Sequence, residues 1–148
     1  MTNIVDRRIS RRGLLGAAGA GAGALLAPGL VTPALAAGFP AVKEESAVIA
    51  FGHVGPISDE GWTWSHHQGY LAVKAAYPKA KYIEVESIPY SADATRTFRQ
   101  FVAQKANLVM LSSEYDDLLH GVSDKAAQIA WMECNGHSVA ANRSWYYV

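Results

Sequence analysis

Cysteine is almost absent from this sequence, which has one, Cys134, among 148 residues. A single thiol excludes an intrachain disulfide and a metal site built from several thiolates. Cys134 follows an apolar run that begins at Ile129, so we expect it to be a small buried side chain. The sequence therefore does not indicate thiol catalysis.

Short motifs of common enzyme classes are also missing. There is no G-x-S-x-G elbow, no H-E-x-x-H motif and no G-x-G-x-x-G loop after the first apolar run,. His66 and His67 are adjacent, and adjacent side chains on a helix diverge. We therefore expect a protein that is not an enzyme, with no cofactor and no metal site. The alternative is a metal-dependent enzyme that uses the loop of His53, Asp59 and His66.

Positive charge is not in excess. The chain has 13 basic and 13 acidic residues. Residues 1–36 hold four of the basic and one of the acidic residues, which leaves nine against twelve, a net charge of −3, in residues 37–148. A mildly acidic domain without a basic cluster lacks the charge that neutralises phosphates. We expect no nucleic-acid partner.

Residues 1–36 have the three parts of an export signal peptide. A basic stretch ends at Arg12, an uncharged run rich in glycine and alanine follows, and an A-x-A pattern ends at Ala36. The segment Ser10–Leu15 resembles a twin-arginine (Tat) motif. Six glycines in the uncharged run argue against a retained membrane helix,. We expect cleavage near Ala37, a periplasmic protein without stable membrane insertion, and no lipid anchor, because no cysteine lies at the cleavage position.

Apolar runs and amphipathic segments alternate along residues 37–148. The apolar runs predict buried strands, and the amphipathic segments predict helices. Regular alternation of this kind indicates an α/β fold with a parallel sheet and helices on both faces. The chain stops on an apolar segment, so we interpret residues 37–148 as one incomplete, truncated lobe. The expected strands are residues 47–51, 81–86, 108–111, 127–134 and 145–148, and the expected helices are 62–77, 93–105 and 115–122.

Two polar loops follow strands that are wholly apolar. In open parallel sheets, ligands bind beyond the carboxyl ends of the strands, where strand order reverses. In the first loop, Asp59 can cap the next helix or accept hydrogen bonds from a ligand. Trp62 can stack on a flat ring, and His66 shares its helix face; packing in the core is the alternative for both. The second loop begins with Ser112 after the third strand.

The first strand, loop and helix resemble those of the basic-membrane-protein (BMP) family of ABC-transporter solute receptors. That family has an Asp, two further residues, an aromatic followed by Asn, and a Gly later in the helix. Asp59, Trp62 and Gly69 match this pattern, and Thr63 stands in place of the usual Asn. The similarity continues through the following elements to the end of the chain.

The resemblance implies a type I periplasmic-binding fold, in which two lobes clamp a nucleoside or purine for an ABC-transporter permease without catalysis. Residues 37–148 would supply only the N-terminal lobe, and closure on a ligand needs both lobes. The candidate ligand contacts are Asp59, Trp62, Thr63, His66, Ser112, Ser113 and Tyr115.

Other small solutes fit the same fold. The pair Trp62 and Trp64 suits a sugar face as well as a base, and a response to carboxylate or ammonium ligands would indicate an amino-acid receptor. A stand-alone interaction module is a further interpretation. It would require this lobe to fold cooperatively by itself.

Overall fold

Five strands and three α-helices make up residues 39–148, the part of the chain that the computed structural model describes, and strands and helices alternate as far as β4. The expected signal peptide, residues 1–36, lies outside the described residues. In chain order the elements are η1 Glu44–Ser46, β1 Val48–Gly52, η2 Ile57–Asp59, α1 Trp62–Ala76, β2 Lys81–Val85, α2 Ala92–Ala103, β3 Leu108–Leu111, α3 Asp116–Ser123, β4 Ala130–Cys134 and β5 Arg143–Tyr146.

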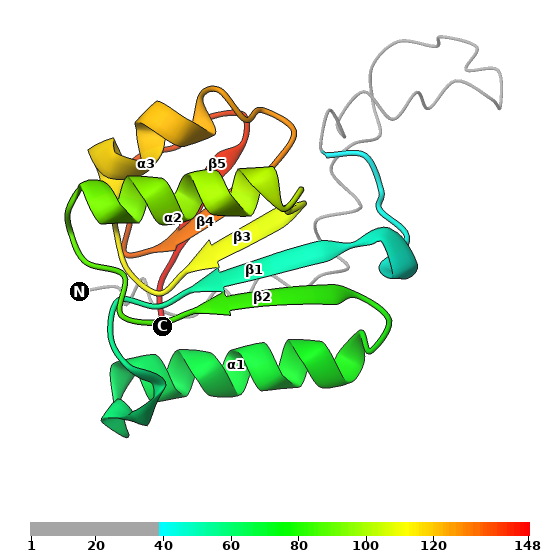
Figure 1. The fold of residues 1–148 in the computed structure, drawn as a ribbon, viewed down its shortest axis with the longest axis horizontal. Coiled ribbons are helices and arrows are strands. Elements are labelled where there is room, and N and C mark those ends of the chain that lie inside the picture. Colours follow the sequence, from blue (N-terminus) through cyan, green and yellow to red (C-terminus); the bar gives the residue numbers. More distant parts are fainter. Residues whose placement is uncertain (1–38) are drawn as a thin grey trace, which may run out of the picture. The chain divides into compact units, whose positions relative to one another are not determined.

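The strands form one parallel sheet in the order β2-β1-β3-β4-β5 (Figure 1). The chain moves to one side of β1 for β2 and to the other side for β3, so the strand order reverses between β1 and β3. Gly52 pairs with Leu111 at the ends of these two strands. The loops that follow them therefore leave the sheet side by side, at the place where parallel sheets bind ligands.

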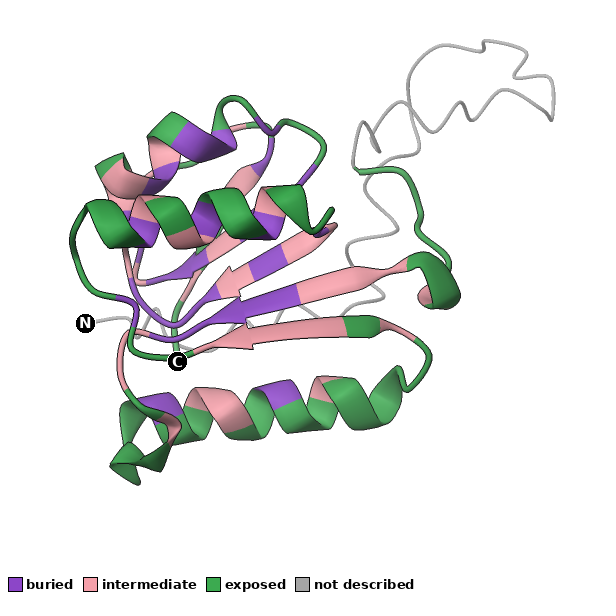
Figure 2. Cartoon of the chain, viewed as in Figure 1, coloured by how far each residue is buried: buried purple, intermediate pink, exposed green. Residues whose placement is uncertain are grey.

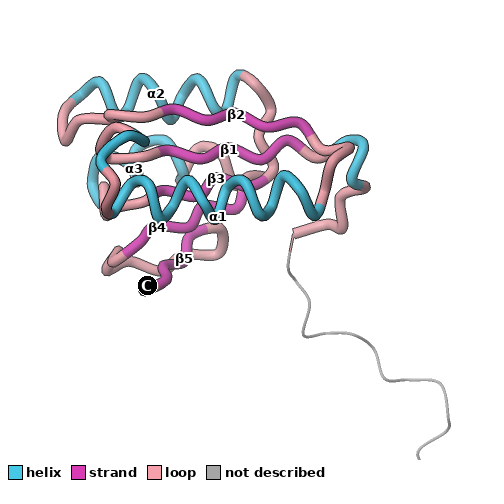
Figure 3. The backbone as a smooth tube through the Cα atoms, turned by 90° about the horizontal axis from the view of Figure 1, so that it is seen from below, coloured by secondary structure: helices cyan, strands magenta, loops and turns pink. Residues whose placement is uncertain are grey.

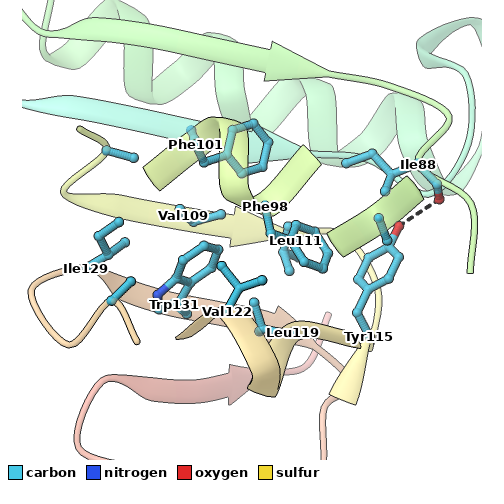
Figure 4. Close-up of a cluster of buried hydrophobic side chains, with 14 residues drawn as sticks. Ile88, Phe98, Phe101, Val109, Leu111, Tyr115, Leu119, Val122, Ile129 and Trp131 are labelled. Carbon is cyan, nitrogen blue, oxygen red and sulfur yellow. Dashed lines mark hydrogen bonds between the residues drawn. The ribbon is translucent and has the colours of Figure 1, made fainter. Parts of the chain in front are cut away.

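Helices cover both faces of the sheet, as the alternation predicted. Figures 1 and 3 show α1 on one face and α2 with α3 on the other. The main core lies under α2 and α3, where Phe98, Phe101 and Trp131 are fully buried (Figure 4). Burial of each such large side chain contributes on the order of 1.5–3 kcal/mol. The face under α1 buries less, chiefly Phe51 and Tyr70.

The amphipathic pattern of α2 explains its position. Ala94, Phe98 and Phe101 recur at helical spacing and are buried against the sheet,. Ser91 caps the helix, because its side-chain oxygen accepts from the backbone N–H of Asp93 at 3.2 Å,. By contrast, most of α1 is exposed (Figure 2). A larger part of α2 than of α1 is therefore buried against the sheet.

The structure shifts several of the predicted strand boundaries, most of all those of β4 and β5. β4 begins at Ala130, not at residue 127, because Ile129 donates its N–H to the carbonyl of Ala126 in a turn, at 3.0 Å. β5 begins at Arg143, two residues earlier than predicted, where it pairs with Trp131. Within residues 39–148, no helix combines the length and apolar character that a membrane span needs.

Candidate functional site

The Asp59 side chain caps the start of α1, two residues before the N-cap position, Gly61. One carboxylate oxygen accepts the backbone N–H groups of Gly61 at 2.8 Å and Trp64 at 2.9 Å, and the other accepts that of Thr63 at 2.9 Å. Hydrogen bonds from the N–H groups of Gly61 and Trp64 lower the pKa of Asp59 to about 2,. Asp59, which was expected to cap the helix or to bind a ligand, therefore uses both carboxylate oxygens to hold the first turn of α1. Thr63 itself is buried.

Trp62 joins the two loops at the carboxyl edge. Its indole N–H donates to the backbone carbonyl of Ser112 at 2.7 Å. The hydroxyl of Ser112 in turn accepts the backbone N–H of Val54 at 3.0 Å. These two hydrogen bonds connect the loop after β1 to the loop after β3. Trp62 itself remains 41% exposed.

A pocket of about 450 Å³ opens between α1 and the sheet at this corner. Its volume lies within the range typical of small-molecule sites. Trp62, His66 and Ser112, three of the predicted contacts, line it together with the apolar rings of Phe51 and Tyr146. The pocket is therefore a mostly apolar slot with a few polar groups.

His66 is oriented toward this pocket by its own helix. Its Nδ1 lies 2.8 Å from the carbonyl oxygen of Trp62, which can only accept, so Nδ1 carries the proton,. The two rings are in contact, with centroids 4.9 Å apart. The predicted shared face of Trp62 and His66 is confirmed.

The other predicted contacts lie away from the pocket. Tyr115 is buried in the main core, and its hydroxyl donates to the carbonyl of Ile88 at 2.9 Å (Figure 4). Its pKa is raised by burial. Ser113 is hydrogen-bonded to the hydroxyl of Tyr90 and to the Glu114 carboxylate. The second loop thus brings only Ser112 to the wall of the pocket.

A buried carboxylate fixes the second loop. Glu133 on β4 is 1% exposed, and its Oε1 accepts the backbone N–H groups of Tyr115 at 2.7 Å and Asp116 at 3.2 Å. These N–H groups open α3 and have no partner within the helix. Burial raises the pKa of Glu133. The sequence analysis did not identify this residue, because its role depends on β4 lying beside β3.

His53 also lines the pocket. From the sequence it was proposed only as one residue of a possible metal-binding loop. It follows β1 directly and is 1% exposed. Its Nε2 lies 2.9 Å from Oε1 of Glu84, and Nδ1 of His67 lies 2.6 Å from the same oxygen. Burial lowers the pKa of His53, and the hydrogen bond to Glu84 opposes that shift. Glu84 was not among the predicted site residues.

Comparison with known proteins places this chain in a family. Residues 46–144 match the model of a family described as ABC transporter substrate-binding protein, PnrA-like (Bmp). A purine-binding protein of Brucella abortus is 29% identical over 111 residues, which cover 74% of this chain and 32% of that protein. The chain therefore spans about a third of the length of this relative.

Two solved structures share the fold. An ABC transporter solute-binding protein from Conexibacter woesei superposes with a TM-score of 0.57 at 14% identity, over 68% of this chain and 35% of that one. A transcriptional activator of the comK gene from Bacillus halodurans superposes with a TM-score of 0.53 at 16% identity, over 67% and 33%. At these identities the likeness shows the fold alone.

Proposed function

Because this chain belongs to the Bmp family of PnrA-like ABC transporter substrate-binding proteins, we propose that it forms one lobe of a receptor for a purine or nucleoside. The family is one of solute-binding proteins and not of enzymes. In the proposal, the receptor delivers its ligand to an ABC-transporter permease. The similarity to a purine-binding protein supports the ligand class.

One observation carries the proposal, namely the position of Trp62. The indole is held at the point where strand order reverses, by its hydrogen bond to Ser112. The ring stays partly exposed at the mouth of an apolar pocket. A fixed, accessible aromatic ring offers a purine a stacking surface worth about 1–3 kcal/mol.

The remaining candidate residues divide into two groups. We propose that His66 and Ser112 face the ligand with Trp62, because they line the same pocket. Asp59 matches the family pattern and Thr63 stands where the family has Asn, and the hydrogen bond from the Thr63 N–H to Asp59 positions the first turn of α1. Ser113 and Tyr115, proposed from the resemblance, support the second loop from behind. The proposed direct contacts are therefore Trp62, His66 and Ser112, and we propose that Asp59, Thr63, Ser113 and Tyr115 position the two loops that carry them.

We further propose export through the pattern of residues 1–36, with residues 37–148 as the N-terminal lobe. A receptor for an importer has to meet its ligand outside the cytoplasmic membrane. The basic stretch, the uncharged run and the A-x-A pattern support this location,. Fractionation of cells that express the gene tests it: the processed protein is expected in the periplasmic fraction, and replacement of Arg11 and Arg12 by lysine should retain it inside.

A ligand panel tests the proposed function. The full-length gene product is melted alone and with purine bases, purine nucleosides, hexoses or amino acids. Ligands that bind only the folded state raise the melting temperature, and at equal concentration a tighter ligand raises it more. We expect an upward shift with purines or their nucleosides. A shift with hexoses or amino acids and none with purines would replace the proposed ligand class by a sugar or amino-acid receptor.

A further inference from the structure

Three side chains with metal-binding atoms converge behind the pocket. They are His53 after β1, His67 on α1 and Glu84 on β2, and one ligand atom from each lies within 4.8 Å of the other two. Oε1 of Glu84 is the common point, 2.9 Å from Nε2 of His53 and 2.6 Å from Nδ1 of His67. The three residues come from separate elements, so the fold itself assembles the set.

The backbone holds each member of this set in place. His53 is fixed on both sides, because its N–H donates to Val85 at 2.8 Å and its carbonyl accepts from Ile88 at 2.9 Å. Glu84 sits in the paired strand β2, opposite Phe51 of β1. His67 stacks on Tyr70, one turn along α1, at a centroid distance of 5.5 Å. Such prior arrangement of ligands favours tight metal binding.

The negative charge of Glu84 is a second argument that this group of residues binds a cation. Glu84 is a half-buried carboxylate, with 17% of its side chain exposed, and among residues 39–148 its only ion-pair partners are the two imidazoles. Partly buried carboxylates are normally paired with a cation or bind a metal. Here no lysine or arginine of the described chain fills that role. A divalent ion would supply the missing positive charge.

We propose that His53, His67 and Glu84 form a binding site for a divalent transition-metal ion of the zinc type. Two imidazole nitrogens and one carboxylate oxygen suit Zn²⁺ or Co²⁺ better than Mg²⁺ or Ca²⁺, which take mainly oxygen ligands. Three protein ligands leave one position of a tetrahedral ion for water. His67 and Glu84 are partly exposed, which gives the ion an entry path.

The side chains have to adjust to bind an ion, because their ligand atoms lie up to 4.8 Å apart. Bonds of about 2.0–2.1 Å to a tetrahedral ion place ligand atoms roughly 3.3 Å apart, so the His67 ring has to turn slightly away from the carboxylate. On binding, each imidazole passes its proton, through solvent, from the ligating nitrogen to the other ring nitrogen. Nδ1 of His53, which has no hydrogen-bond partner among the described residues, can take that proton. The imidazoles stay neutral.

The site can be tested by titrating the protein, purified without a polyhistidine tag, with Co²⁺ followed by its visible absorption. We expect one Co²⁺ per chain with a tetrahedral spectrum, displaced by one equivalent of Zn²⁺. H67Q and E84Q should each weaken binding by about tenfold or more. H137Q is the matched control, because His137 is exposed near Asp116 and remote in sequence from the set.

Binding that H67Q and E84Q leave unchanged, or that H137Q abolishes, would overturn the proposal. So would the absence of saturable Co²⁺ binding. Should the variants lose their circular dichroism, X-ray absorption at the zinc edge of the wild-type protein decides. Two imidazoles per zinc support the site, and one or none contradicts it. The proposal does not depend on which solute the receptor carries, so purine binding and metal binding can fail separately.

Discussion

The indole nitrogen of Trp62 lies 2.7 Å from the carbonyl oxygen of Ser112. This hydrogen bond crosses the point where strand order reverses and ties the start of α1 to the loop after β3. It gives the aromatic ring a fixed direction before any ligand arrives. A site arranged in advance loses less entropy when it binds.

Removal of this hydrogen bond should destabilise the chain without removing the ring. In W62F the Ser112 carbonyl loses its donor, and we expect the free energy of unfolding to fall by about 1 kcal/mol. Urea denaturation measures the change. W64F is the matched control, since the Trp64 side chain is 46% exposed on the same helix turn. An equal loss in both variants would contradict a specific role for the Trp62 hydrogen bond.

The Asp59 cap should make stability depend on pH in the acid range. Its pKa falls from 3.8 to about 2 in the folded chain. A depressed pKa means that the ionised carboxylate stabilises the fold above about pH 4, and that this contribution is lost as the pH falls through about 2. D59N should lower the melting temperature at neutral pH and flatten its dependence between pH 4 and 2.

Melting curves at several pH values provide the measurement. D117N is the control, because Asp117 is fully exposed on α3 and lies apart from the cap of α1. It should leave the melting temperature at neutral pH almost unchanged. A D59N protein that melts like the wild type at every pH would show that the cap does not hold α1 in place.

We expect Glu133 to stabilise the fold by accepting hydrogen bonds and not through its negative charge. It accepts the N–H groups of Tyr115 and Asp116 while fully buried. In E133Q the amide oxygen can still accept, and because burial disfavours the ionised form, we expect stability close to or above that of the wild type. In E133L both N–H groups lose their partner, at a cost of about 1–3 kcal/mol for each group left unpaired.

Chemical denaturation of both variants separates these roles. M132L, at the neighbouring position of β4, controls for a change of size in the strand. Should E133Q lose as much stability as E133L, the carboxylate charge and not its acceptor function would hold the second loop. That result would point to Arg143, whose positive charge lowers the pKa of Glu133 against the effect of burial.

Most of the fold could be predicted from periodicity, for a physical reason. Strands buried on both faces are continuous apolar runs, and Leu108–Leu111 was located without error. The start of β4 was misplaced because residues 127–129 have the composition of a strand but lie in a turn. Only the hydrogen bond from Ile129 to Ala126 shows this, and no periodic pattern records it.

The site was only partly predictable. Trp62, His66 and Ser112 line one pocket, and they could be singled out from the sequence because they follow strand ends or share a helix face, which are local rules. Tyr115 was expected at the ligand, yet it is buried in the core. The group of His53, His67 and Glu84 was missed because it depends on register: Glu84 pairs opposite Phe51 of β1, 33 positions earlier in the chain. Local spacing carries no information about such a pairing.

Binding of a purine to Trp62 is the central claim, and calorimetric titration of the full-length gene product tests it most directly. Wild-type, W62A and W64A proteins are titrated with the purine or purine nucleoside that gives the largest thermal shift. We predict saturable binding at one site per chain, weakened in W62A by about 1–3 kcal/mol, the stacking energy of one base, and unchanged in W64A. Equal affinity in wild type and W62A, or no binding of any purine, would contradict the account.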